Sequence, residues 1–195
     1  MKNIISYGFE CIYRENFMEQ IQTWIRGIKQ CFEPTEMSGL LFGNKFRDYN
    51  EQDMYDKIQV NIAKRGMVDF TIGQEENDFT VFAEDCSPGK VVNFYLYIDK
   101  EKMSFDFVDE LMLDGGMLAY KCSREDVFWQ DMEDISIYEF YGKSTKGLRT
   151  IKSPLGLNEM VIDIEQNPGH SHNVFRIWFG AWHKMWFGED YYQFV

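Results

Sequence analysis

Apolar residues follow two different periods in the first part of the chain. In residues 15–32 they recur at the i, i+4, i+7, i+8 spacing of one helix face, which predicts an amphipathic helix. The residues of this face are Phe17, Ile21, Trp24, Ile25, Ile28 and Phe32. Residues 4–13 are instead rich in β-branched and aromatic types, so they predict a strand before the helix.

A period of two dominates further along, where segments 67–72, 79–83 and 91–98 predict three strands. One face of the third strand is apolar and consists of Val92, Phe94, Leu96 and Ile98. Its other face consists of Val91, Asn93, Tyr95 and Tyr97. We expect the apolar face in a core, and the tyrosine-bearing face either half-exposed or packed under a helix.

The remaining elements are predicted from shorter patterns. A second helix is expected at 51–65, with Tyr55, Ile58 and Ile62 inward and Gly66 just after its end. Trp182, Met185 and Trp186 are three and four residues apart, which predicts one helical turn laid on the sheet. The other expected elements are a helix at 105–113 capped by Ser104 and strands at 38–42, 117–122, 159–164 and 173–179.

Interspersed helices and strands, with several strands adjacent in sequence, predict an α+β fold. We expect a mainly antiparallel sheet with helices packed on one face, and the β-α-β opening is compatible with a ferredoxin-like N-terminal half. No stretch rich in Pro, Gly or Ser interrupts the chain, so residues 1–195 are interpreted as one domain. The alternative is a division into subdomains 1–100 and 104–195.

Composition and charge narrow the function classes. An apolar content of 45% with 17% aromatic residues excludes a disordered chain. The net charge of −12 argues against a nucleic-acid partner, because binding to phosphates needs clustered Lys and Arg. No segment is apolar enough to span a membrane, and the four cysteines show no close pairing. We therefore expect a cytoplasmic protein with free thiols and no membrane contact.

The motifs tested for chemistry give little support to an enzyme. Gly-Lys-Ser-Thr at 142–145 lacks the glycine of a phosphate-binding loop, since Ile137 stands in its place. Acidic neighbours of Cys86 oppose formation of a thiolate. His170 and His172, in Gly-His-Ser-His, are candidate metal ligands for a small metal-dependent hydrolase, and the alternative is a polar turn. We expect no cofactor and no catalytic residue.

The distribution of charge is more informative. Residues 123–141 interleave aromatic side chains with six acidic ones, and residues 142–152 are basic. Such a segment is either a solvated connection that its aromatic residues attach to the core, or a surface that recognises a basic protein. For the second interpretation the candidate partner-binding residues are Trp129, Asp131, Glu133 and Asp134, with Trp182 and Tyr191 as a second group.

Three stretches resemble small acidic bacterial immunity-type proteins. They are Gly-Gly-x-Leu-Ala-Tyr at 115–120, Glu-Asp followed by Phe-Trp-Gln at 125–130, and Ile-Tyr-x-Phe-Tyr-Gly-Lys at 137–143. With the aromatic C-terminus, the likeness covers about a third of the chain. It implies a cytoplasmic, non-enzymatic protein that neutralises a cognate toxin, here a basic one such as a nuclease. The alternatives are the metal-dependent hydrolase and a structural module that homodimerises through its aromatic C-terminus.

Overall fold

The structure is a computed structural model that describes residues 4–99, 108–113, 116–156, 158–174, 177–180 and 182–193. Its centre is an eight-stranded antiparallel sheet with the order β12-β7-β1-β6-β5-β4-β2-β3. The strands are β1 (Ile4–Ile12), β2 (Glu36–Ser38), β3 (Arg47–Asp48), β4 (Val68–Gln74), β5 (Asn77–Ala83), β6 (Val91–Asp99), β7 (Gly116–Ser123) and β12 (Lys184–Phe187). The fold is therefore α+β, as predicted.

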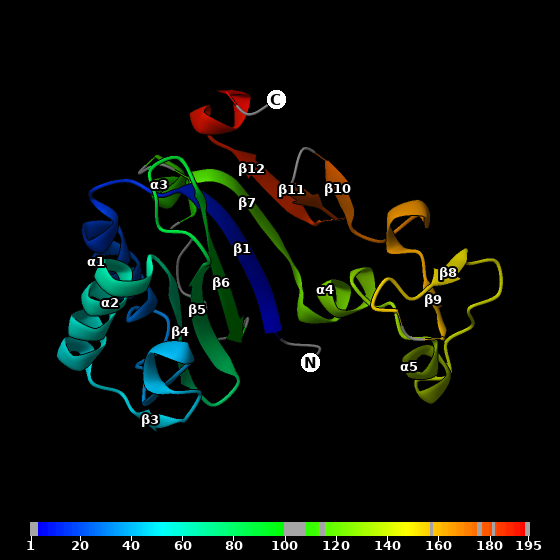
Figure 1. Cartoon of the computed structure of the whole chain (residues 1–195), viewed down its shortest axis with the longest axis horizontal. Helices are drawn as coiled ribbons and strands as arrows, with labels where there is room; N and C mark the ends of the chain where they lie inside the picture. The colour runs from blue at the N-terminus through cyan, green and yellow to red at the C-terminus, as the bar shows by residue number, and fades with distance from the viewer. Residues whose placement is uncertain are drawn as a thin grey trace.

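Two helices, α1 (Phe17–Ile28) and α2 (Glu51–Arg65), cover one face of the sheet (Figure 1). The predicted apolar face of α1 is buried, and Trp24 packs against Phe9 and Phe94 at ring distances of 4.5 and 4.6 Å. The predicted bounds of α2 are confirmed. Its end is set by Gly66, which has a φ of 65° and donates its N–H to the Ile62 carbonyl.

The strand alternation is also confirmed. Val92, Phe94, Leu96 and Ile98 are buried beneath the two helices. The residues between them are half-buried on the opposite face, so β6 separates an apolar side from a tyrosine-bearing side. β1 and β2, which flank α1, are separated in the sheet by β6, β5 and β4.

Three local predictions are wrong. Residues 38–42 do not form a strand, because β2 ends at Ser38 and Leu40–Phe42 form a short 3-10 helix, η1. Gly39 makes this turn with a φ of 112°, and a side chain there would meet the Phe70 backbone at 2.8 Å. The predicted strand 173–179 is divided into β10 (His172–Val174) and β11 (Ile177–Phe179), which pair with each other.

The third error concerns residues 182–186, which form no helical turn. Residues 184–187 form β12, whose Met185 and Trp186 pair with Tyr120 and Ala119 of β7. The backbone groups on the outer edge of β7 are paired by this strand, and that requirement overrides the local helical spacing. α3 (Val108–Leu113) lies within the predicted helix 105–113, and its proposed cap, Ser104, lies outside the described residues.

The chain between β7 and β12 lies on the side of the sheet away from α1 and α2, and its part with α5, β8 and β9 projects away from the sheet (Figure 1). We call its described residues from Arg124 to Trp182 the arm. The elements of the arm are α4 (Arg124–Gln130), α5 (Ile135–Phe140), β8 (Thr150–Lys152), β9 (Met160–Ile162), η2 (Ile164–Gln166), β10 and β11. After β12 comes a last 3-10 helix, η3 (Glu189–Gln193).

Strands from both halves of the sequence share the central sheet, since β7 and β12 continue it beyond β1. Among the helices of the described segments, none is long and apolar enough to cross a membrane.

Candidate functional site

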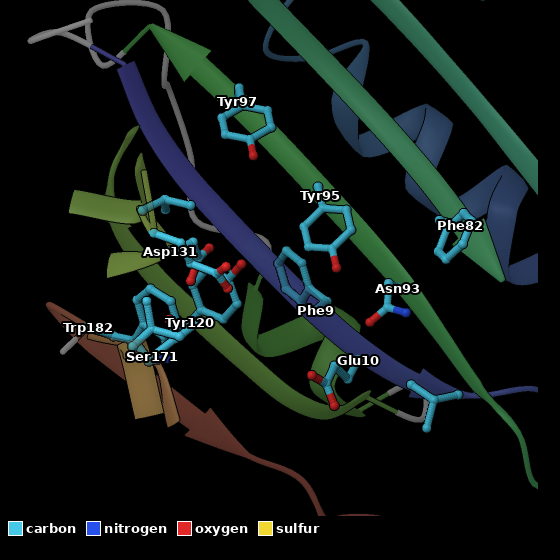
Figure 2. A pocket seen from close by; sticks show the side chains of 14 residues that line it. Phe9, Glu10, Phe82, Asn93, Tyr95, Tyr97, Tyr120, Asp131, Ser171 and Trp182 are labelled. Atoms are coloured by element: carbon cyan, nitrogen blue, oxygen red, sulfur yellow. The ribbon is translucent and has the colours of Figure 1, made fainter. Parts of the chain in front are cut away.

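A cavity of about 680 Å³ lies between the tyrosine-bearing face of the sheet and the arm. This volume is within the usual range of ligand-binding clefts. Figure 2 shows the side chains that line it, several of which project from β6 on one side. The lining residues are Phe9, Glu10, Phe82, Val91, Asn93, Tyr95, Tyr97, Tyr120, Val127, Asp131, Glu133, Ile164, Ser171 and Trp182.

The strand register brings the sheet residues of this lining together. Glu10 of β1 lies opposite Asn93 of β6, and Gly8 lies between Tyr95 of β6 and Tyr120 of β7. Directly opposed residues of neighbouring strands share a face, so these side chains all point away from α1 and α2. The arm then supplies the residues that close the cavity from the other side.

Gly8 makes room for an aromatic wall. A Cβ atom at this position would lie 2.1 Å from Cζ of Tyr120, so the Tyr120 ring lies directly over the β1 backbone. Trp182 stacks on that ring, with centroids 4.0 Å apart and planes inclined by 9°. The indole N–H of Trp182 is buried and has no hydrogen-bond partner among the described residues. The rings of Tyr120 and Trp182 are thus stacked in a fixed position, and the indole N–H remains without a partner among the described residues.

The charged residues of the lining are all acidic. They are Glu10, Asp131 and Glu133, and no Lys, Arg or His is among the described residues that line the cavity. Burial raises the pKa of Glu10 to about 7. Burial, together with the nearby charge of Glu10, raises the pKa of Tyr95 to about 12. The cavity is therefore a partly desolvated environment of negative sign.

A cation from the arm contacts one of the lining tyrosines, although it is not itself part of the lining. The guanidinium carbon of Arg124 lies 4.8 Å from the centroid of the Tyr97 ring. Asp78 lies opposite Tyr97 across the β5–β6 pair. Burial raises the pKa of Asp78 to about 6, and the charge of Arg124 opposes that rise. An arginine, a tyrosine and a carboxylate thus interact at the edge of the cavity, where Tyr97 is the lining residue.

The six predicted partner-binding residues lie at different places in the structure, and three of them line the cavity. Asp131, Glu133 and Trp182 line the cavity together. Trp129 instead packs against Tyr138, with ring centroids 5.1 Å apart, and lies beneath the ammonium of Lys143 at 4.0 Å. Trp129 therefore belongs to a cluster within the arm.

The last two predicted residues lie elsewhere. Asp134 caps α5, where its carboxylate accepts hydrogen bonds from the backbone N–H and the hydroxyl of Ser136 at 2.8 and 2.7 Å. Tyr191 of η3 packs on Phe187 with ring centroids 4.8 Å apart. Neither residue lines the cavity. Three of the six residues therefore line the cavity, and the other three lie outside its lining.

Sequence reasoning did not select Glu10, Tyr95, Tyr97 and Tyr120 as site residues. The available signal was the tyrosine-bearing face of β6, which is unusually polar and aromatic for a strand in the middle of a sheet. Which other strands flank that face is decided only by the pairing of β6 with β1 and of β1 with β7.

The two candidate metal-ligating histidines bond to other groups. Nε2 of His170, a buried residue, lies 2.9 Å from the Tyr138 hydroxyl. Nδ1 of His172 lies 2.7 Å from the Glu165 carbonyl oxygen. Within the described ranges, no three His, Cys, Asp or Glu residues are grouped so that they could hold a metal ion. The geometry gives the metal-dependent hydrolase no further support.

Two other sequence motifs can be judged from their positions. Residues 142–145 follow the C-terminal end of α5, whereas a phosphate-binding loop precedes the N-terminus of a helix. Burial raises the pKa of Cys86 to about 11, and the charge of Asp85 adds to this shift. The predicted opposition to thiolate formation at Cys86 is therefore confirmed, with burial as its main cause.

The shape and lining of the cavity are the main guide to function. Comparisons of the chain with protein-family models, curated proteins and solved structures found no match.

Proposed function

We propose that this protein binds another protein and is an immunity-type inhibitor that neutralises a cognate basic toxin without catalysing a reaction. The observation that carries the proposal is the acidic and aromatic cavity, whose lining places Glu10, Asp131 and Glu133 beside stacked rings. Aromatic residues contribute contact energy with little loss of conformational entropy, and carboxylates select a partner of positive charge.

The charge of the whole chain supports the same kind of partner. A net charge of −12 attracts a basic protein over a distance of about one Debye length, roughly 8 Å at physiological salt. Two of the three stretches that resemble immunity-type proteins also lie near the cavity. The first ends at Tyr120, and the second is followed directly by Asp131.

The test first asks whether a neighbouring gene encodes a protein with a toxin-like C-terminal domain. That domain is then expressed together with the chain, and cell growth and complex formation are measured. We expect protection of growth and a 1:1 complex. Replacing Asp131→Lys together with Glu133→Lys should weaken the complex at least tenfold, because two cavity carboxylates become cations. Asp134 is left unchanged in this variant, since its replacement would also remove the cap of α5.

The matched control is Glu19→Lys with Asp56→Lys. It makes the same change in net charge on exposed positions of α1 and α2, which cover the opposite face of the sheet. Both double variants should slow association similarly, whereas only the cavity variant should speed dissociation. Absence of any complex, or equal dissociation rates for the two variants, would contradict the proposal.

A further inference from the structure

An acid–aromatic set at the edge of the cavity has a cation, and a second set within the lining has none among the described residues. At the edge the guanidinium of Arg124 lies over the lining residue Tyr97, and Asp78 lies opposite Tyr97 on β5. The adjacent part of the lining repeats this chemistry with Tyr95 and Glu10 of the sheet. Among the described lining residues, no basic side chain serves this second set. The contact between Arg124 and Tyr97 thus shows that a tyrosine of this lining can bind a guanidinium group.

The second set has the properties that a guanidinium requires. The rings of Tyr95 and Trp182 both line the cavity, and the face of an aromatic ring carries the negative side of its quadrupole, which attracts a cation. Carboxylates from the sheet, at Glu10, and from the arm, at Asp131 and Glu133, can accept its N–H donors from different directions. Burial of Glu10 without a counter-charge is unfavourable to its ionised form, and a bound cation would offset that effect.

Trp182 is a lining residue that can report binding. Its indole N–H is buried and has no hydrogen-bond partner among the described residues. A ligand that enters the cavity and contacts this ring would change the environment of the N–H.

We propose that this cavity binds the side chain of an arginine presented by the protein partner, an inference that rests on the proposed function. Arginine is favoured over lysine because its planar guanidinium stacks on rings and offers five donors in a fixed arrangement. The same chemistry is available from a free guanidino compound, so the experiment must separate the two sources.

The experiment titrates N-acetyl-L-arginine amide into the full chain and follows the NMR resonance of the Trp182 indole N–H. We expect saturable binding with a Kd on the order of 1 mM, as for a single side chain. The neutral citrulline counterpart should bind at least tenfold more weakly. Replacing Asp131→Asn with Glu133→Gln should abolish the arginine response, whereas the control Glu19→Gln with Asp56→Asn should retain it.

Equal binding of the citrulline compound, or an unchanged arginine response in the cavity variant, would overturn the inference. Free L-arginine that binds at least tenfold more tightly than the capped residue would assign the cavity to a small molecule, and would also overturn it. If the toxin complex depends on Asp131 and Glu133 but capped arginine does not bind, the inference fails and the proposed function stands. Arginine binding without any toxin complex would instead contradict the proposed function.

Discussion

At the scale of single residues, the aromatic wall of the cavity depends on the absence of a Cβ atom at Gly8. Most residues in the middle of a strand add a side chain to its face, but here Tyr120 of β7 occupies the space above Gly8. The ring is thereby positioned to stack on Trp182 of the arm. A glycine in a strand interior often marks a close approach of this kind, and here it connects the sheet to the arm.

Replacing Gly8→Ala should therefore destabilise the protein and displace the Tyr120 ring. We expect a loss of about 1–3 kcal/mol in the free energy of unfolding, the usual effect of overpacking, measured by urea denaturation. The near-ultraviolet circular dichroism of the stacked rings should also weaken.

A double-mutant cycle provides the control for this prediction. In a Tyr120→Ala background the additional methyl group has no ring to displace, so Gly8→Ala should be nearly neutral. An equal loss of stability in both backgrounds would show that the effect comes from the strand itself and not from the contact with Tyr120.

At the scale of elements, the arm has a small core of its own. Tyr138 of α5 and His170, which precedes β10, are both buried and bonded to each other at 2.9 Å. The backbone adds a second connection, in which the N–H of Ile162 in β9 donates to the Glu133 carbonyl. These contacts hold α5 and the segment around His170 together at one end of the arm. The histidine thus has a structural partner in place of the metal that its motif suggested.

Replacing Tyr138→Phe should loosen this part of the arm. The variant leaves the buried Nε2 of His170 without a partner, which costs about 1–3 kcal/mol. Hydrogen exchange of the α5 amides should accelerate, while the amides of β1 and β6 should be unaffected.

Tyr141→Phe is the matched control, because Tyr141 lies at the end of the same helix and is 49% exposed. Equal acceleration of exchange in the two variants would contradict a role for the bond to His170. Stoichiometric zinc, iron or manganese in the purified protein, lost on replacing His170, would support the metal-dependent hydrolase instead.

At the scale of the whole molecule, the sheet separates two different environments. One side is an apolar core under α1 and α2 (Figure 1), and the other is a partly buried acidic cavity beside the arm (Figure 2). The ionised form of Glu10 opposes folding, since burial raises the pKa of this carboxyl and disfavours its charge. The free energy of unfolding should therefore depend on pH in a direction set by Glu10.

The pKa of Glu10 is raised from 4.5 to about 7 in the folded state, so between these values the folded protein binds more protons than the unfolded chain. Stability contributed by protonated Glu10 is full below pH 4.5 and is lost as pH rises through about 7. The raised pKa of Asp78 acts in the same direction over a lower range, up to about 6. Replacing Glu10→Gln should therefore flatten the fall in stability between pH 5 and 8, by up to roughly 3 kcal/mol.

The measurement is urea denaturation at a series of pH values, with Glu19→Gln as the control. Glu19 is exposed on α1, so its replacement removes one charge without changing the cavity. A slope against pH that is unchanged in Glu10→Gln would show that Glu10 is not the group responsible.

The sequence by itself determined the elements whose signals are local. The buried side of a segment is recorded in its period, which is 3.6 residues in α1 and two in β6. The end of the hydrogen bonds of α2 is recorded in Gly66. Three of the six predicted partner-binding residues also lie in the cavity lining. Asp131 and Glu133 were identified because acids and aromatic residues interleave in residues 123–141, and Trp182 was identified from the aromatic C-terminus.

The tertiary structure alone decided what these elements enclose. The pairings of β1 with β6 and β7, and of β7 with β12, connect segments far apart in sequence. A strand of suitable pattern can form the same backbone hydrogen bonds with many partners, so its pattern does not specify its neighbour. The spacing of Trp182 and Trp186 predicted a helical turn because it carries no information about long-range pairing. Residues 184–187 instead form a strand, because they pair with the edge of β7. The cavity between Glu10, Tyr120 and Trp182 exists only because those long-range bonds form.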